Sequence, residues 1–163
     1  MVDIINRHKT GVDLSDKTLD TMGQLLNTHL ATSFDLYSQT KQAHWNVKGM
    51  HFIALHQLFD TLAESILEYV DMIAERATAL GADAMGTARM SAQATELAEF
   101  PMNNLDGQVV LEAMIDRYSA YGNLAREAID AASEAGDEVT TDLFTEITRG
   151  MDKHLYFLQS HLS

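Results

Sequence analysis

Cysteine is absent from this sequence, and a single proline, Pro101, interrupts its 163 residues. The lack of cysteine excludes both a disulfide framework and any thiolate metal site. A metal ion bound by this chain would therefore use His, Asp and Glu side chains, which are the harder ligands. The scarcity of proline leaves room for long, uninterrupted helices.

Long apolar runs and an excess of positive charge are missing too. No run approaches the roughly 20 apolar residues that span a bilayer, and residues 1–13 lack the apolar segment of a secretory signal, so we expect a cytoplasmic protein with no membrane partner. The formal net charge of -13 repels nucleic acid over most of the surface and favours cations as ligands. Apolar residues make up 46% of the chain, which is typical of one folded domain rather than a disordered one.

Apolar positions recur at helical spacing in four long segments, which predicts an all-α fold. Ser15 is a natural N-cap for the first segment, and Gly49 and Gly81 are natural stops for the first two. The expected helices cover residues 16–48, 52–80, 106–136 and 137–162. The connection over 81–105, with a short helix near 92–98, is too long for a hairpin turn and suits the crossover of a ferritin-like four-helix bundle. We expect one such domain over residues 15–163 and a short tail over 1–14.

Potential metal ligands are densest in the first two helices. His56 and Asp60 are four residues apart, and so are Asp71 and Glu75, so each pair lies on one helix face and could hold a cation. His44 and His56 lie at equal distances from the middle of the turn between the helices, so an antiparallel hairpin would bring their imidazoles to a similar level. Each pair alone is more typical of a solvated surface. Two imidazoles and three carboxylates along one hairpin favour a metal site.

The same stretch resembles the Dps family (DNA-binding protein from starved cells), a group of miniferritins. The resemblance lies in Lys41-Gln42-Ala43-His44-Trp45-Asn46, then Gly49, Phe52, His56 and Asp60, then Asp71-Met72-Ile73-Ala74-Glu75-Arg76. It implies a four-helix bundle that assembles into a hollow dodecamer in bacteria. It also implies iron storage with ferroxidase activity: Fe(II) is oxidised, preferentially by hydrogen peroxide, and Fe(III) is kept in the cage, which protects against oxidative stress.

Carried over residue by residue, the resemblance makes His44, His56, Asp60, Asp71 and Glu75 the ferroxidase ligands. Trp45 matches the family's tryptophan beside the site, where it would intercept oxidising equivalents, although a large aromatic residue is by default core packing. Bundle-core di-iron sites use Glu-x-x-His motifs, and none of the seven histidines here has a glutamate three residues before it. The iron site must therefore be built differently from that of ordinary ferritins.

Helix geometry predicts that this site is shared between two chains. His56 and Asp71 are separated by roughly 22 Å along one helix, yet point within roughly 60° of each other. An antiparallel copy related by a two-fold axis near Glu64 would set His56 of one chain opposite Asp71 and Glu75 of the other. Such pairing is the commonest oligomer symmetry, and it would give two equivalent sites in each dimer of the cage.

A second acidic group comprises Asp137, Glu138, Asp142 and Glu146, at the start of the fourth helix. Acidic residues are favoured there by the helix dipole, which explains them without a function. In Dps cages this region lies near the three-fold channels that admit iron, so the resemblance makes the four residues candidates for the iron pore.

Two alternatives remain open. The family name suggests DNA binding and association with the nucleoid, but residues 1–18 hold Arg7, Lys9 and Lys17 against Asp3, Asp13 and Asp16, which leaves no net charge. Because DNA affinity depends on several phosphate contacts, we expect weak or no DNA binding. Zinc prefers the same imidazole and carboxylate ligands as iron and could occupy the site.

Overall fold

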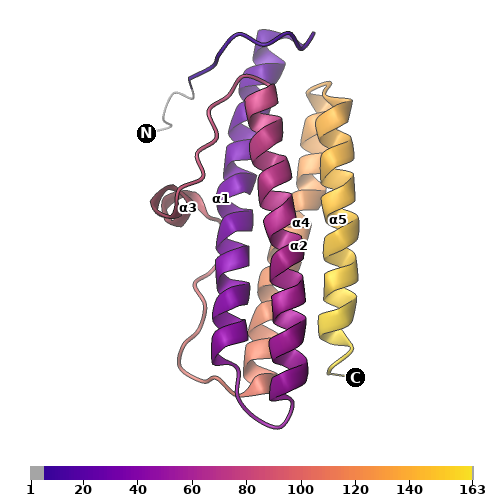
Figure 1. The fold of residues 1–163 in the computed structure, drawn as a ribbon. Coiled ribbons are helices and arrows are strands. Elements are labelled where there is room, and N and C mark those ends of the chain that lie inside the picture. The colour runs from indigo at the N-terminus through magenta and orange to yellow at the C-terminus, as the bar shows by residue number, and fades with distance from the viewer. Residues whose placement is uncertain (1–5, 163) are drawn as a thin grey trace.

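The computed structural model describes residues 6–162 and confirms the expected all-helical fold. Within these residues the elements are α1 (Asp16–Asn46), α2 (Phe52–Ala79), α3 (Ala88–Ala94), α4 (Gly107–Glu134) and α5 (Glu138–Gln159). The four long helices stand side by side, α1 and α2 form one hairpin, α4 and α5 form another, and the crossover carrying α3 runs beside α1 (Figure 1). None of the helices described is long and apolar enough to cross a membrane.

The helix ends follow the capping signals in the sequence. The Ser15 side chain accepts a hydrogen bond from the backbone N–H of Thr18, as an N-cap should. Gly49 and Gly81 adopt positive φ values of 106° and 87°, which few other residues tolerate, and they end the first two helices. The crossover helix was predicted about four residues too late. It starts after Thr87, whose hydroxyl accepts from Met90 N, and it ends where Thr95 turns to extended backbone.

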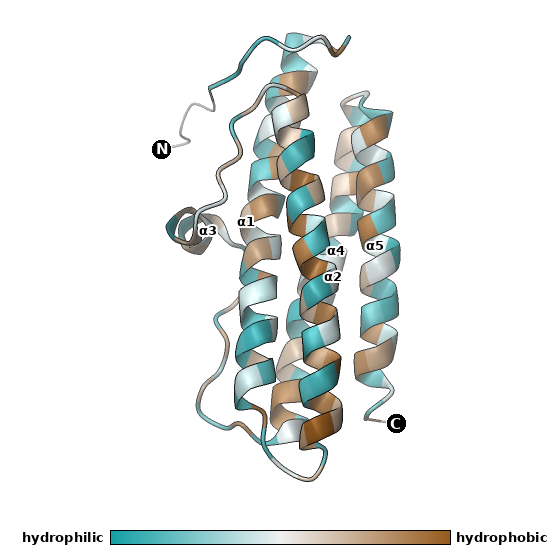
Figure 2. Ribbon diagram, viewed as in Figure 1, coloured by the Kyte–Doolittle hydropathy of each residue, from teal (hydrophilic) through white to brown (hydrophobic). Residues whose placement is uncertain are grey.

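The core fills the space between the four long helices. Each long helix buries one stripe of apolar side chains against the others, so that Leu26 and Leu36 of α1, Phe59 of α2, Tyr118 of α4 and Phe144 of α5 have no exposed surface. In Figure 2 the hydrophobic and hydrophilic bands alternate along each helix accordingly. This packing fixes the register of α1 against α2, and so the level at which their side chains meet.

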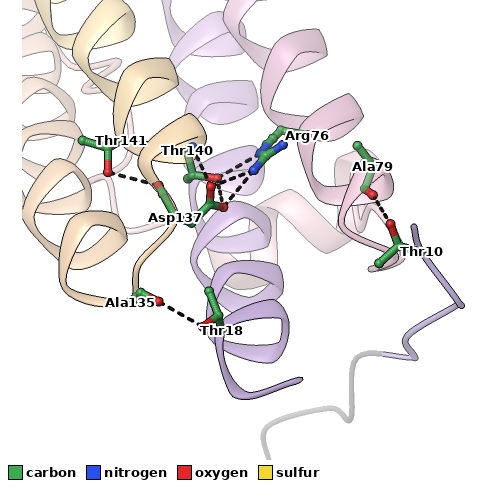
Figure 3. Close-up of polar contacts among 8 residues, drawn as sticks. All are labelled: Thr10, Thr18, Arg76, Ala79, Ala135, Asp137, Thr140 and Thr141. Atoms are coloured by element: carbon green, nitrogen blue, oxygen red, sulfur yellow. Dashed lines mark hydrogen bonds and ion pairs between the residues drawn. The ribbon is translucent and has the colours of Figure 1, made fainter. Parts of the chain in front are cut away.

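The N-terminal segment from residue 6 onward lies against the far end of the same hairpin. The Arg7 guanidinium pairs with Asp16 at 2.7 Å and with Asp20 at 2.9 Å. The His8 ring lies 2.8 Å from the Asp83 carboxylate. Figure 3 shows the Thr10 hydroxyl donating to the Ala79 carbonyl. Residues 7–10 are therefore attached to the bundle.

Candidate metal centre

The end of α1 and the start of α2 bring two histidines into contact. The rings of His44 and His56 stack with their centroids 3.8 Å apart and their planes 19° from parallel. Each ring also bonds the other's backbone: His44 Nδ1 lies 2.7 Å from the His56 carbonyl, and His56 Nδ1 lies 2.8 Å from the His44 carbonyl. The expectation that the hairpin sets these imidazoles at one level is confirmed.

This reciprocal pairing fixes which ring nitrogens can bind a metal. A carbonyl oxygen only accepts hydrogen bonds, so Nδ1 must be the donor in both rings. The neutral form of each imidazole then carries its lone pair on Nε2. A backbone carbonyl that holds Nδ1–H is the usual partner of a metal-ligating histidine, because it fixes the tautomer and the ring orientation.

Asp60 supplies a carboxylate beside this pair. Its Oδ1 lies 3.9 Å from His44 Nε2 and accepts a hydrogen bond from Lys41 Nζ at 2.6 Å. The Lys41 hydrogen bond lowers the pKa of Asp60 below its ordinary value, so the carboxylate is ionised at neutral pH. We call His44, His56 and Asp60 the half-site: two imidazoles whose Nε2 atoms are free and one carboxylate lie near one another, although within one chain they do not form a cluster that could hold a metal ion.

Lys41 is not itself a metal ligand, and its role becomes visible only in the folded hairpin. It lies three residues before His44, which is about one helical turn, so the spacing alone could have placed it on the same face. Its ammonium group also lies 5.9 Å from the centroid of the Trp45 ring. Trp45 is 62% exposed, so its explanation as ordinary core packing does not apply within one chain.

Asp71 and Glu75 do not join the half-site in a single chain. Both are exposed on the second half of α2, about four helical turns beyond His56. Within residues 6–162, no three His, Asp or Glu side chains come together in a way that could hold a metal ion. One chain thus carries the two halves of the predicted ligand set at separate places.

Asp137 differs from the other acidic residues near the start of α5. Its carboxylate is 2% exposed and accepts from Arg76 Nη2 at 2.8 and 2.9 Å, as well as from the N–H and hydroxyl of Thr140 (Figure 3). Burial raises the pKa of Asp137, but the hydrogen bonds from Thr140 and Arg76 outweigh it, and the pKa lies below its ordinary value. Asp137 caps α5 and ties it to α2, so it cannot also face an open channel. Glu138, Asp142 and Glu146 are exposed.

Comparisons with known proteins show the family to which this fold belongs. The family model of the ferritin-like domain matches residues 23–163. The DNA protection during starvation protein of Agrobacterium fabrum is 42% identical over 155 residues, which cover 95% of this chain and 96% of that protein. The chain belongs to the Dps family.

Two solved Dps structures share the whole fold. DpsC from Streptomyces coelicolor has a TM-score of 0.91 and 29% identity, with 97% of this chain and 92% of that chain covered. A Dps protein from Vibrio cholerae, described as a member of a broad superfamily of ferritin-like diiron-carboxylate proteins, has a TM-score of 0.87 and 26% identity, with 97% and 99% covered. As a ferritin-like Dps protein, this chain falls in a family whose general role is iron storage.

Proposed function

We propose that this protein is a cytoplasmic iron-storage and detoxification protein. It oxidises Fe(II), preferentially with hydrogen peroxide, and keeps the ferric product inside a dodecameric cage. The observation that carries the proposal is the stacked pair of His44 and His56, whose backbone-bonded Nδ1 atoms leave both Nε2 atoms free beside the Asp60 carboxylate. Mixed imidazole and carboxylate ligands hold Fe(II) and stabilise Fe(III) once it forms.

The remaining ligands come from a second copy of the chain. Because Asp71 and Glu75 lie far along α2 from His56, a compact site requires the α2 of a two-fold partner running antiparallel. The outer face of α1 and α2 is suited to that contact: a groove of about 360 Å³ is lined by apolar side chains, among them Phe34 and Val70, and by Asp71 itself. Leu67, in the same groove, is 44% exposed.

In this proposed pairing, the metal ligands of the two chains would face the same site. His44, His56 and Asp60 of one chain would face Asp71 and Glu75 of its partner, giving two imidazoles and three carboxylates for iron. Zinc, which accepts the same ligands, is the expected competitor for this site. Glu138, Asp142 and Glu146, the exposed acidic residues at the start of α5, would attract Fe(II) to its channel into the cage.

The electron balance explains how a site with two irons can consume peroxide without releasing radicals. Reducing hydrogen peroxide to two waters takes two electrons and two protons, and two Fe(II) ions in one site supply both electrons together. A lone Fe(II) ion supplies one electron and releases hydroxyl radical. Trp45, exposed beside His44, is placed to absorb oxidising equivalents that escape.

Complementation tests the shared site, which is our first prediction. In one variant His44 and His56 are replaced by alanine. In a second variant Asp71 and Glu75 are replaced by alanine. Each alone should lose nearly all peroxide-dependent Fe(II) oxidation, because every site loses two of its five proposed ligands. Mixed dimers contain one intact site and one doubly damaged site, so co-assembly should restore part of the activity.

The matched control is Glu68→Ala, because Glu68 is another exposed acidic residue on α2. This variant should oxidise iron at the original rate. Size-exclusion chromatography verifies that each variant assembles, and differently tagged chains verify that mixed dimers form. Mixed dimers as inactive as the separate variants would contradict sharing. Normal oxidation in both separate variants would remove all four residues from the iron site.

A further inference from the structure

A second pair of histidines lies at the same end of the bundle, on a different face. His51 immediately precedes α2, and His161 follows α5. Both line one cavity of about 200 Å³, together with Gln108 at the start of α4 and apolar walls that include Leu111. The cavity is lined by residues from the starts of α2 and α4 and from the turn after α5, whereas the His44–His56 pair joins the end of α1 to the start of α2. The two places are therefore separate.

The His161 ring is oriented as the candidate iron ligands are. Its Nδ1 lies 2.8 Å from the Phe157 carbonyl oxygen. Since that oxygen can only accept, Nδ1 carries the proton, and the neutral ring has its lone pair on Nε2. The turn that follows α5 thus presents a histidine whose neutral tautomer can bind a metal through Nε2.

The other two polar groups of the cavity are also available. The His51 side chain makes no capping hydrogen bond at the start of α2, so its ring is free to turn. Gln108 Nε2 donates to Glu112 Oε1 at 2.9 Å, which fixes the amide and leaves its Oε1 as an acceptor. The cavity is therefore lined by two imidazole rings and one side-chain amide from three parts of the chain.

We propose that this cavity is a second metal site, in which His51, His161 and Gln108 bind one divalent transition-metal ion of the zinc type. Imidazole is a good ligand for zinc, copper and nickel, whereas calcium and magnesium require mostly oxygen ligands. Two imidazoles and one amide oxygen leave a tetrahedral position for water. The ion would also join the end of α5 to the turn between α1 and α2, so binding would stabilise the fold.

Zinc binding to the assembled, full-length protein is the test, and our second prediction. The background variant carries His44→Ala and His56→Ala, so that zinc cannot bind at the proposed iron centre. After metal removal with a chelator, Zn²⁺ alone is added and its affinity is measured by competition with a chromogenic zinc indicator. The background should retain about one Zn²⁺ per chain. Adding His51→Ala or His161→Ala should weaken that affinity about 10-fold or more.

His8→Ala in the same background is the matched control, because His8 is another exposed histidine far from this cavity. The His8 variant should bind zinc with unchanged affinity. Zinc should raise the melting temperatures of the background and of this control, but not those of the His51→Ala and His161→Ala variants. Background protein that retains no zinc would overturn the proposal. So would an unchanged affinity in either the His51 or the His161 variant.

Discussion

Two histidines lie inside the bundle, among aromatic rings. The His29 ring contacts Phe144, with centroids 4.5 Å apart, and the His154 ring lies between Tyr69 and Tyr118. Burial lowers the pKa of His29 to about 4, and burial with the nearby charge of Lys153 lowers the pKa of His154 to about 4. Both rings are therefore neutral in the folded protein at pH 7.

Acid should destabilise the protein through these two residues, which is our third prediction. In the unfolded chain each ring has a pKa near 6.5, whereas in the folded state the pKa of each ring is about 4. Stability is thus complete above pH 6.5 and is lost as the pH falls from 6.5 to about 4, by on the order of 3 kcal/mol for each ring.

Melting temperatures measured from pH 7.5 to pH 4.5 test this effect. The double variant His29→Phe and His154→Phe should lose less of its melting temperature over this range than the unmodified protein. With metal ions removed by a chelator, His51→Gln takes away an exposed ring outside the bundle core and should leave the pH dependence unchanged. Parallel curves for the unmodified protein and the double variant would show that other groups cause the acid sensitivity.

Residue spacing predicted which side chains of the hairpin lie close together but not how each is held. The distances in sequence among His44, His56 and Asp60 placed them on one hairpin, and the structure brings them together. The reciprocal Nδ1 bonds depend on the exact approach of two backbones, which no periodicity encodes. The buried pairing of Asp137 with Arg76 escaped prediction for the same reason, because its partner lies 61 residues away on another helix.

At the level of elements, the long helices were predictable because their signals are local. Capping by Ser15 and positive φ at Gly49 and Gly81 involve neighbouring residues only. The crossover helix was misplaced because its seven residues carry little periodicity, and a single threonine cap determines its start. The distance between neighbouring helices depends on tertiary packing, which local signals do not encode. Two glycines within helices illustrate this.

Gly150 and Gly122 should respond oppositely to alanine, which is our fourth prediction. A Cβ on Gly150 of α5 would collide with the Tyr69 hydroxyl of α2 and come within 2.9 Å of its Cζ. Displacing that ring should cost about 1–3 kcal/mol of stability. A Cβ on Gly122 of α4 would meet Met151 Cβ at an ordinary 3.6 Å. Gly122→Ala should therefore stabilise the helix by about 0.5–1 kcal/mol.

Chemical denaturation of the two single variants measures both signs. Tyr69→Phe removes the nearest colliding atom, so adding it to Gly150→Ala should recover part of the loss. If both glycine variants change stability in the same direction, the close approach of α2 and α5 is not what decides the choice of glycine at position 150.

At the scale of the whole molecule, charge opposes the binding of DNA. The net charge of -13 is spread over a chain with 24 acidic and 11 basic residues. Of the basic residues near the N-terminus, Arg7 is paired with Asp16 and Asp20 on α1. Asp3, which belongs to the charge count of the tail, lies outside the described residues. The segment that would have to reach phosphate groups is therefore partly neutralised and attached to the bundle.

Our fifth prediction is that the assembled protein does not retard duplex DNA in a gel near physiological salt and neutral pH. DNA affinity grows with the number of phosphates that basic side chains neutralise, and a segment with no net positive charge releases few counterions. A variant with Asp3→Lys and Asp13→Lys adds four units of positive charge to each N-terminus and should retard the same DNA, which shows that the assay can detect binding. Retardation by the unmodified protein, lost on deleting residues 1–14, would show that the tail binds DNA despite its neutrality. Retardation that survives the deletion would place binding on the cage surface, where the net negative charge makes it least expected.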